Sequence, residues 1–115
     1  MGWTKDATRT EVREEVFARD GRCIAGLVDP EAGPCKTKWG VVVPPGLRYY
    51  RGREVWTVDH VPRFAGSTRI SSRRWMVTLC WGHHGHPSYW ETAHRNEERK
   101  YLLRKEGPDA EDSAP

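Results

Sequence analysis

The sequence lacks any long apolar run and has only three cysteines. Without about 20 consecutive apolar residues we expect no membrane-spanning helix, and without an apolar segment near its beginning we expect no signal peptide. An odd number of cysteines argues against a small secreted scaffold, in which cysteines usually pair in even sets. We therefore expect a soluble protein of the cytoplasm, whose reduced cysteines are available as metal ligands.

Apolar residues are also scarce, at 37% of 115 positions, whereas 30% of the residues are charged. A chain of this length forms one small domain with a thin core, and a bound metal ion is a common source of extra stability. We expect a single domain over residues 1–106. Residues 107–115 contain three acids and no base, and we expect them to form a disordered tail.

Negative charge is in the minority, with 16 acidic residues against 19 lysines and arginines, of which 14 are arginine. Because three of the acids lie in the tail, the remainder of the chain is more basic than its net charge of +3 suggests. Arginine makes bidentate contacts with phosphate. The composition favours a nucleic-acid partner, although a solvated basic surface is the simpler alternative.

Two helices are predicted, one near each end of the chain. The first spans residues 8–19, where Thr8 and Glu11 have the spacing of a capping box, and the Asp20-Gly21 turn ends it. The second is long and spans residues 87 or 88 to 106. Ser88 and Glu91 repeat the capping-box spacing, and the Gly107-Pro108 pair is a stop signal.

Between the two helices the pattern alternates between loops and short strands rich in valine, tryptophan and threonine. This order predicts an α+β fold. The expected strands span residues 41–43, 53–60 and 74–79, and the expected loops span residues 24–34 and 62–72.

Cysteine and histidine spacing predicts a structural zinc site. Cys80 and His83 are three positions apart, so that one turn offers two ligands, and Cys23 and Cys35 supply the other pair. Eleven residues separate that second pair, which is wider than usual, and an inserted loop would explain the spacing. The alternatives are that Cys23 and Cys35 are small buried hydrophobes or a chance pair. The spacing also allows Cys80 with His84, in which case His83 or His86 takes the other role.

Asp59, His60 and His84 are not needed for this zinc site and are therefore candidates for a catalytic role. A carboxylate and an imidazole can bind a divalent ion, and a second imidazole with a pKa near neutrality can accept a proton. This set is what a phosphodiesterase with one metal ion requires. The alternative for Asp59 and His60 is a surface turn.

Three segments, residues 17–23, 58–62 and 79–84, together resemble the HNH endonuclease family of ββα-metal nucleases, many of which phages encode. The resemblance spans about residues 12–95. It implies that Asp59 is the first metal ligand, that His60 is the general base and that His84 is the metal ligand at the start of the ββα helix. His83 stands where zinc-binding members usually have a second cysteine.

The resemblance implies a small ββα-metal fold that a structural zinc ion stabilises, and a Mg²⁺ or Mn²⁺ ion that supports hydrolysis of DNA phosphodiester bonds. A phage packaging (terminase) complex is suggested only by the habits of the family. Cleavage of both strands by one active site per chain requires a homodimer or two successive events, so both a monomer and a homodimer are open. The alternative function is a zinc-containing nucleic-acid-binding protein that has lost cleavage.

Trp75 is the best support for that alternative, because it stands where the family has the asparagine that steadies the loop between the two strands. The only asparagine of the chain is Asn96. Another polar side chain would have to replace it, and the candidates are Ser71, Ser72 and Thr78.

Further basic and aromatic residues are candidates for contacts with nucleic acid. Phosphate contacts are expected from arginines that flank the site, with the cluster of Arg69, Arg73 and Arg74 the foremost. Tryptophans could stack on bases but are expected to serve mainly in packing. His86 is a possible further metal ligand, and we expect His94 to be a solvated helix residue. The complete set of candidate arginines is Arg63, Arg69, Arg73, Arg74 and Arg95.

Overall fold

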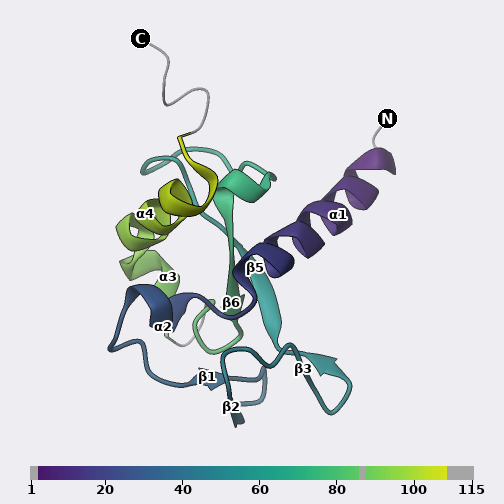
Figure 1. The fold of residues 1–115 in the computed structure, drawn as a ribbon, viewed down its shortest axis with the longest axis vertical. Coiled ribbons are helices and arrows are strands. Elements are labelled where there is room, and N and C mark those ends of the chain that lie inside the picture. The colour runs from purple at the N-terminus through teal and green to yellow at the C-terminus, as the bar shows by residue number, and fades with distance from the viewer. Residues whose placement is uncertain (1–2, 86–87, 109–115) are drawn as a thin grey trace.

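The computed structural model describes residues 3–85 and 88–108, and of residues 3–9 the backbone alone (Figure 1). His86 and residues 109–115 of the expected tail therefore lie outside the described residues. Helices and short antiparallel strands both occur, so the α+β class is confirmed. No helix among the described residues is long and apolar enough to cross a membrane.

The first helix, α1 (Trp3–Asp20), begins five residues before the expected start at Thr8. The predicted capping box is therefore wrong. The preceding residues contain neither glycine nor proline after position 2, so nothing interrupts the helix there. Its predicted end is confirmed: Gly21 adopts a φ of +67°, and its N–H donates to the carbonyl of Phe17 over 2.8 Å.

The C-terminal segment forms two helices, α3 (Trp90–Ala93) and α4 (Arg95–Glu106), where one continuous helix is predicted. The helix is interrupted at His94, between α3 and α4. The imidazole ring of His94 stacks on the ring of Trp90, with the ring centroids 4.5 Å apart. The predicted capping box also fails, because the carboxylate of Glu91 accepts from the N–H of Gly85. The predicted stop holds: Gly107 has a φ of +75° and bonds back to Leu103.

Six short strands pair as three antiparallel hairpins among the described residues. The expected strand over residues 53–60 is divided at Val55, whose N–H donates to the carbonyl of Arg48. The expected strand at 41–43 is shortened to residues 42–43. The expected strand at 74–79 is shifted to residues 76–80, because residues 73–75 form a 3-10 turn, η1 (Arg73–Trp75). The pairs are β1 (Cys35–Lys36) with β2 (Val42–Val43), β3 (Tyr49–Tyr50) with β4 (Arg53–Glu54), and β5 (Trp56–His60) with β6 (Met76–Cys80).

The β5–β6 hairpin lies at the centre of the molecule, with α1 on one side and α3 and α4 on the other (Figure 1). A short helix, α2 (Ala25–Val28), interrupts the expected loop over residues 24–34. The core is apolar and forms where these elements meet. Its most deeply buried large side chains are Phe17, Ile24, Val55, Val61, Val77, Leu79 and Leu102.

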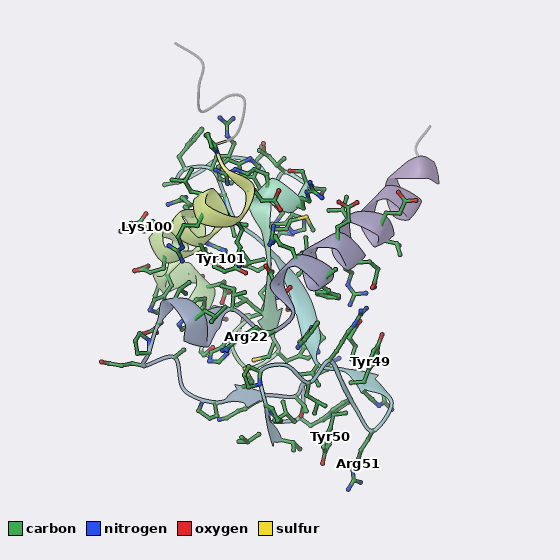
Figure 2. The ribbon with its side chains drawn as sticks, in the orientation of Figure 1. Arg22, Tyr49, Tyr50, Arg51, Lys100 and Tyr101 are labelled. Carbon is green, nitrogen blue, oxygen red and sulfur yellow. The ribbon has the colours of Figure 1, made fainter. Side chains whose placement is uncertain are left out.

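Asp20 joins three of these elements through its buried carboxylate. One oxygen accepts from the backbone N–H of Thr78 in β6 over 2.9 Å, and the other accepts from the hydroxyl of Tyr101 over 2.7 Å. Tyr101 lies on the side of α4 that faces the sheet (Figure 2). Arg19 donates to the same carboxylate over 2.7 Å. The end of α1 is thereby fixed to the hairpin that carries Asp59 and His60.

Candidate metal centres and catalytic pocket

A buried cluster of three thiols and one imidazole occurs where the zinc site is predicted. Cys23 follows α1, Cys35 begins β1, Cys80 ends β6 and His83 lies in the next turn. Their four potential ligand atoms lie within 4.8 Å of one another. All three cysteines are free thiols. The loop that contains α2 returns Cys35 to Cys23, which accounts for the wide spacing in the sequence.

The imidazole of His83 is oriented for metal binding. Its Nε2 lies 2.8 Å from the carbonyl oxygen of Ala32 and must carry the proton that it donates there. The lone pair of Nδ1 therefore faces the thiols, with Cys80 Sγ at 3.2 Å and Cys23 Sγ at 3.6 Å. Two ligands of one tetrahedral zinc ion lie about 3.5–3.8 Å apart, so the contact with Cys23 is within this range and the contact with Cys80 is slightly shorter.

The thiols are crowded in a way that a cation would relieve. The pKa of the Cys23 thiol is raised above its ordinary value, first by the adjacent Cys35 thiol, then by Cys80 and by burial. A bound divalent cation reverses this balance, since the thiolate is the form that ligates metal. The cluster can therefore hold a zinc ion, as predicted, and His84, the alternative ligand, does not belong to it.

His84 instead faces Asp59, a residue of β5 that is only 2% exposed. The hydroxyl of Thr57 donates to the carbonyl of Leu79 over 2.8 Å and so accepts from Nδ1 of His84 over 2.7 Å. This leaves the lone pair of His84 Nε2 directed towards Asp59 Oδ1, 3.6 Å away. Mg²⁺ ligands lie about 2.0–2.1 Å from the ion, so two donors of one ion are at most about 4.2 Å apart. The pair satisfies that limit.

His60 lines the same pocket, which has a volume of about 490 Å³. Its Nε2 lies 3.4 Å from the hydroxyl of Ser71 in the loop between β5 and β6. The pocket thus brings together the three residues that the sequence singled out for catalysis. Its described lining is Val58, Asp59, His60, Pro62, Ser67, Arg69, His84, Glu91 and Arg95.

Arg95 has a partner that the sequence did not predict. Its guanidinium donates to Asp59 Oδ2 over 2.7 Å and to Glu98 Oε1 over 2.9 Å. Glu98 is fully buried, and burial, followed by the nearby Asp59 carboxylate, raises its pKa to about 10. The spacing of Arg95 and Glu98 on a helix is a sequence signal for an ion pair. Nothing in the sequence indicates that this pair meets Asp59.

The other candidate arginines are dispersed. Arg69 lines the pocket, whereas Arg73 is held by Glu15 and Glu106 at 3.1 and 3.2 Å. Arg63 and Arg74 lie over the ring of Trp75, at 5.7 and 4.3 Å. Of the predicted cluster, Arg69 thus lines the described pocket, Arg73 is paired with acids and Arg74 lies on Trp75.

Trp75, at the position of the family's asparagine, is buried in η1. Its backbone fixes the β5–β6 loop, because its carbonyl accepts from Val61 and its N–H donates to Ser72 O. Of the polar side chains considered as a replacement, Ser71 is the one that reaches His60, whereas Thr78 is buried against α1. The loop is therefore restrained by a backbone bond and by Ser71.

Two further expectations can be compared with the structure. His94 is not a solvated residue: its Nδ1 donates to Trp90 O over 2.7 Å, and its Nε2 lies 3.2 Å from Asp29. The tryptophans do not all serve in packing. Trp56, Trp75 and Trp90 are buried, but Trp39 is 64% exposed and Trp81 is 37% exposed.

Comparisons with protein-family models, with curated proteins and with solved structures find no match to this chain.

Proposed function

We propose that this chain is a metal-dependent DNA endonuclease of the HNH type, with a ββα-metal fold formed by β5, β6 and the helices that follow. The observation that carries the proposal is the convergence of Asp59 Oδ1 and His84 Nε2, 3.6 Å apart, in a pocket that His60 also lines. Both atoms have lone pairs that face each other, and the pocket is open to a substrate.

In this proposal Asp59 and His84 hold Mg²⁺ or Mn²⁺, and His60 acts as the general base. A divalent ion held by Asp59 and His84 would stabilise the charge that develops on the phosphate and on the leaving oxygen. His60 takes a proton from water, the water oxygen forms a bond to phosphorus, and the bond from phosphorus to the 3′ oxygen breaks. The leaving oxygen is protonated by solvent. Arg69 contacts a phosphate of the DNA.

The buried Cys23, Cys35, Cys80 and His83 cluster supports a structural zinc ion beside this pocket. Cys80 ends the strand that pairs with the strand of Asp59, so the ion stabilises the turn from which His84 projects. A monomeric or homodimeric state and a role in a phage packaging (terminase) complex stay predictions from the family resemblance.

A second candidate is a zinc-containing protein that binds nucleic acid without cutting it. Arg95 favours this candidate, because its guanidinium lies 2.7 Å from the second oxygen of Asp59 and brings a positive charge to the metal position. The buried Trp75 in place of the asparagine points the same way.

A plasmid nicking assay separates the two candidates. We expect Mg²⁺ or Mn²⁺ to support nicking of supercoiled DNA, EDTA to stop it, and His60→Ala to lower the rate by about 10²- to 10⁴-fold. The matched variant Asp59→Ala should regain part of its activity at high Mn²⁺, whereas His60→Ala should not. His60→Ala should also melt like the wild type. Nicking by His60→Ala at the wild-type rate would refute the assigned base.

A further inference from the structure

Two exposed tryptophans and three cations share one surface at the β1–β2 and β3–β4 hairpins. This surface, which we call the hairpin face, comprises Lys38, Trp39, Tyr50, Arg51, Arg53 and Trp81. It carries two hollows of about 500 and 280 Å³, and Trp39, Arg51 and Arg53 line both. Figure 2 shows Tyr50 and Arg51 at the end of the β3–β4 hairpin. None of the six residues lines the pocket of Asp59.

The two indoles are well placed to receive a flat ligand. Trp39 is 64% exposed, which leaves most of its ring in contact with solvent. Trp81 is held in place because its Nε1 donates to the carbonyl oxygen of Glu54 over 3.1 Å. A large aromatic ring left in solvent loses the stabilisation of burial, so two of them beside one hollow indicate a binding surface.

Each cation of the hairpin face lies beside an aromatic ring. Lys38 Nζ is 5.2 Å from the Trp81 ring centroid, the Arg53 guanidinium is 5.0 Å from that of Trp39, and that of Arg51 is 5.7 Å from Tyr50. Among the side chains that the structure describes, no carboxylate forms an ion pair with any of these three cations.

The one acid in the larger hollow is already neutralised. The carboxylate of Glu54 accepts from Arg13 through one oxygen and from Arg48 over 2.7 Å through the other. The hairpin face therefore presents net positive charge around exposed rings. This combination suits a ligand with both negative charge and flat apolar faces.

The backbone at Arg51 supplies an independent observation. Arg51 and Gly52 form the tight β3–β4 turn with φ values of +50° and +76°. Asparagine, aspartate and glycine are the residues that favour the first position of such a turn, and arginine is unfavourable there. The arginine at this position projects its charge from the hairpin at a cost in backbone strain.

We propose that the hairpin face binds unpaired nucleotides of single-stranded nucleic acid, with bases stacked on Trp39 and Trp81 and phosphates contacted by Lys38, Arg51 and Arg53. Unpaired bases expose the faces on which indoles stack, whereas a duplex hides them. The site is separate from the Asp59 pocket and needs no step of the proposed cleavage.

The test measures binding of the full zinc-loaded chain to an oligothymidylate and to a duplex of equal length, without added Mg²⁺ or Mn²⁺. We expect Trp39→Ala to weaken oligothymidylate binding by about tenfold, since stacking on one base contributes about 1–3 kcal/mol. Trp39→Phe should retain most of the affinity, because a smaller ring still stacks. Duplex binding should change less than twofold in both variants.

Arg51→Gly separates ligand contact from folding. It relieves the positive φ, so we expect a melting temperature equal to or above that of the wild type together with weaker oligothymidylate binding. Lys100→Ala is the control for the loss of one cation, since it removes an exposed positive charge from α4, keeps a good helix former there and should leave binding unchanged. Wild-type binding by both Trp39→Ala and Arg51→Gly, or an equal loss of duplex binding, would overturn the proposal. If the wild-type chain binds oligothymidylate as expected but does not nick plasmid DNA, only the proposed cleavage activity is refuted.

Discussion

In the pocket of Asp59 the guanidinium of Arg95 is held between the buried side chains of Asp59 and Glu98. On the hairpin face the cations of Arg51 and Arg53 lie beside the rings of Tyr50 and Trp39, and no carboxylate among the described side chains pairs with them. The same residue type thus serves two purposes. In the pocket, Arg95 neutralises the buried carboxylate of Asp59 and is less able to contact a phosphate. An unpaired arginine in solvent retains its charge for a ligand.

This comparison changes where nucleic-acid contacts are expected. From the sequence alone, phosphate contacts are predicted for the arginines nearest the Asp59-His60 pair, because the sequence shows proximity only along the chain. Arg73 and Arg95 are nevertheless bound by acids of α1 and α4. Arg69 lines the pocket, and Lys38, Arg51 and Arg53 of the hairpin face form no ion pair with the carboxylates that the structure describes.

The largest expected effect on stability comes from the cluster of Cys23, Cys35, Cys80 and His83, because it joins the hairpin face to the strand beside the Asp59 pocket. Cys35 begins the β1–β2 hairpin, and Cys80 ends β6 beside the pocket. Cys80→Ser should lower the melting temperature sharply and release stoichiometric zinc, since metal binding in small domains contributes about 10–16 kcal/mol to folding.

His84→Ala is the matched control for the zinc cluster, because it changes a neighbouring histidine outside the cluster and should retain zinc. Metal content by mass spectrometry and thermal melts test both variants. A metal-free chain that melts at the wild-type temperature would contradict the structural role of the cluster.

The next largest loss of folding stability is expected when Arg95 is replaced. Arg95→Ala leaves the buried carboxylate of Asp59 without its cation, and breaking such a buried pair costs about 3–5 kcal/mol. The proposed metal site predicts a partial rescue, because an ion on Asp59 replaces the lost positive charge. Mn²⁺ should therefore raise the melting temperature of Arg95→Ala more than that of the wild type. An equal shift in both proteins would argue against metal binding at Asp59.

Glu98 tests the electrostatics of the pocket through pH. Its pKa is raised to about 10 by burial, whereas in the unfolded chain the carboxyl titrates near its ordinary value, about 4.3. The folded state therefore holds a proton that the unfolded state releases, and the contribution of Glu98 to stability falls as pH rises between these values.

Glu98→Gln removes this titration, so its stability relative to the wild type should increase from pH 5 to pH 9 in chelator-free, divalent-free buffer. Thermal or urea unfolding across that range measures the difference. A constant difference would show that Glu98 does not take up a proton on folding.

The smallest expected effect concerns the salt dependence of DNA binding. Removal of one phosphate contact reduces the slope of log affinity against log salt by about one. Arg53→Glu should flatten that slope for single strands more than Arg73→Glu, because Arg73 is already engaged by Glu15 and Glu106. Equal slopes for the two variants would erase the distinction between paired and unpaired arginines.

The sequence alone indicated the residue types of both candidate metal sites and the positions of several boundaries. The spacing of Cys80 and His83 predicted half of the thiol cluster, and the Asp20-Gly21 and Gly107-Pro108 pairs predicted two helix ends. These predictions held because spacing within a turn and the conformation of glycine are local properties. The wide spacing of Cys23 and Cys35 left the cluster open to other interpretations.

Only the tertiary structure decided which histidine belongs to which site and which cations are available. His83 and His84 are adjacent in the chain, but Ala32 and Thr57 orient one towards the thiols and the other towards Asp59. The break of the last helix at His94 likewise depends on Trp90 and Asp29. Arg95 reaches Asp59 across 36 positions of the sequence, and the hairpin face assembles from three separate segments. Such contacts depend on packing between distant segments, which spacing along the chain does not encode.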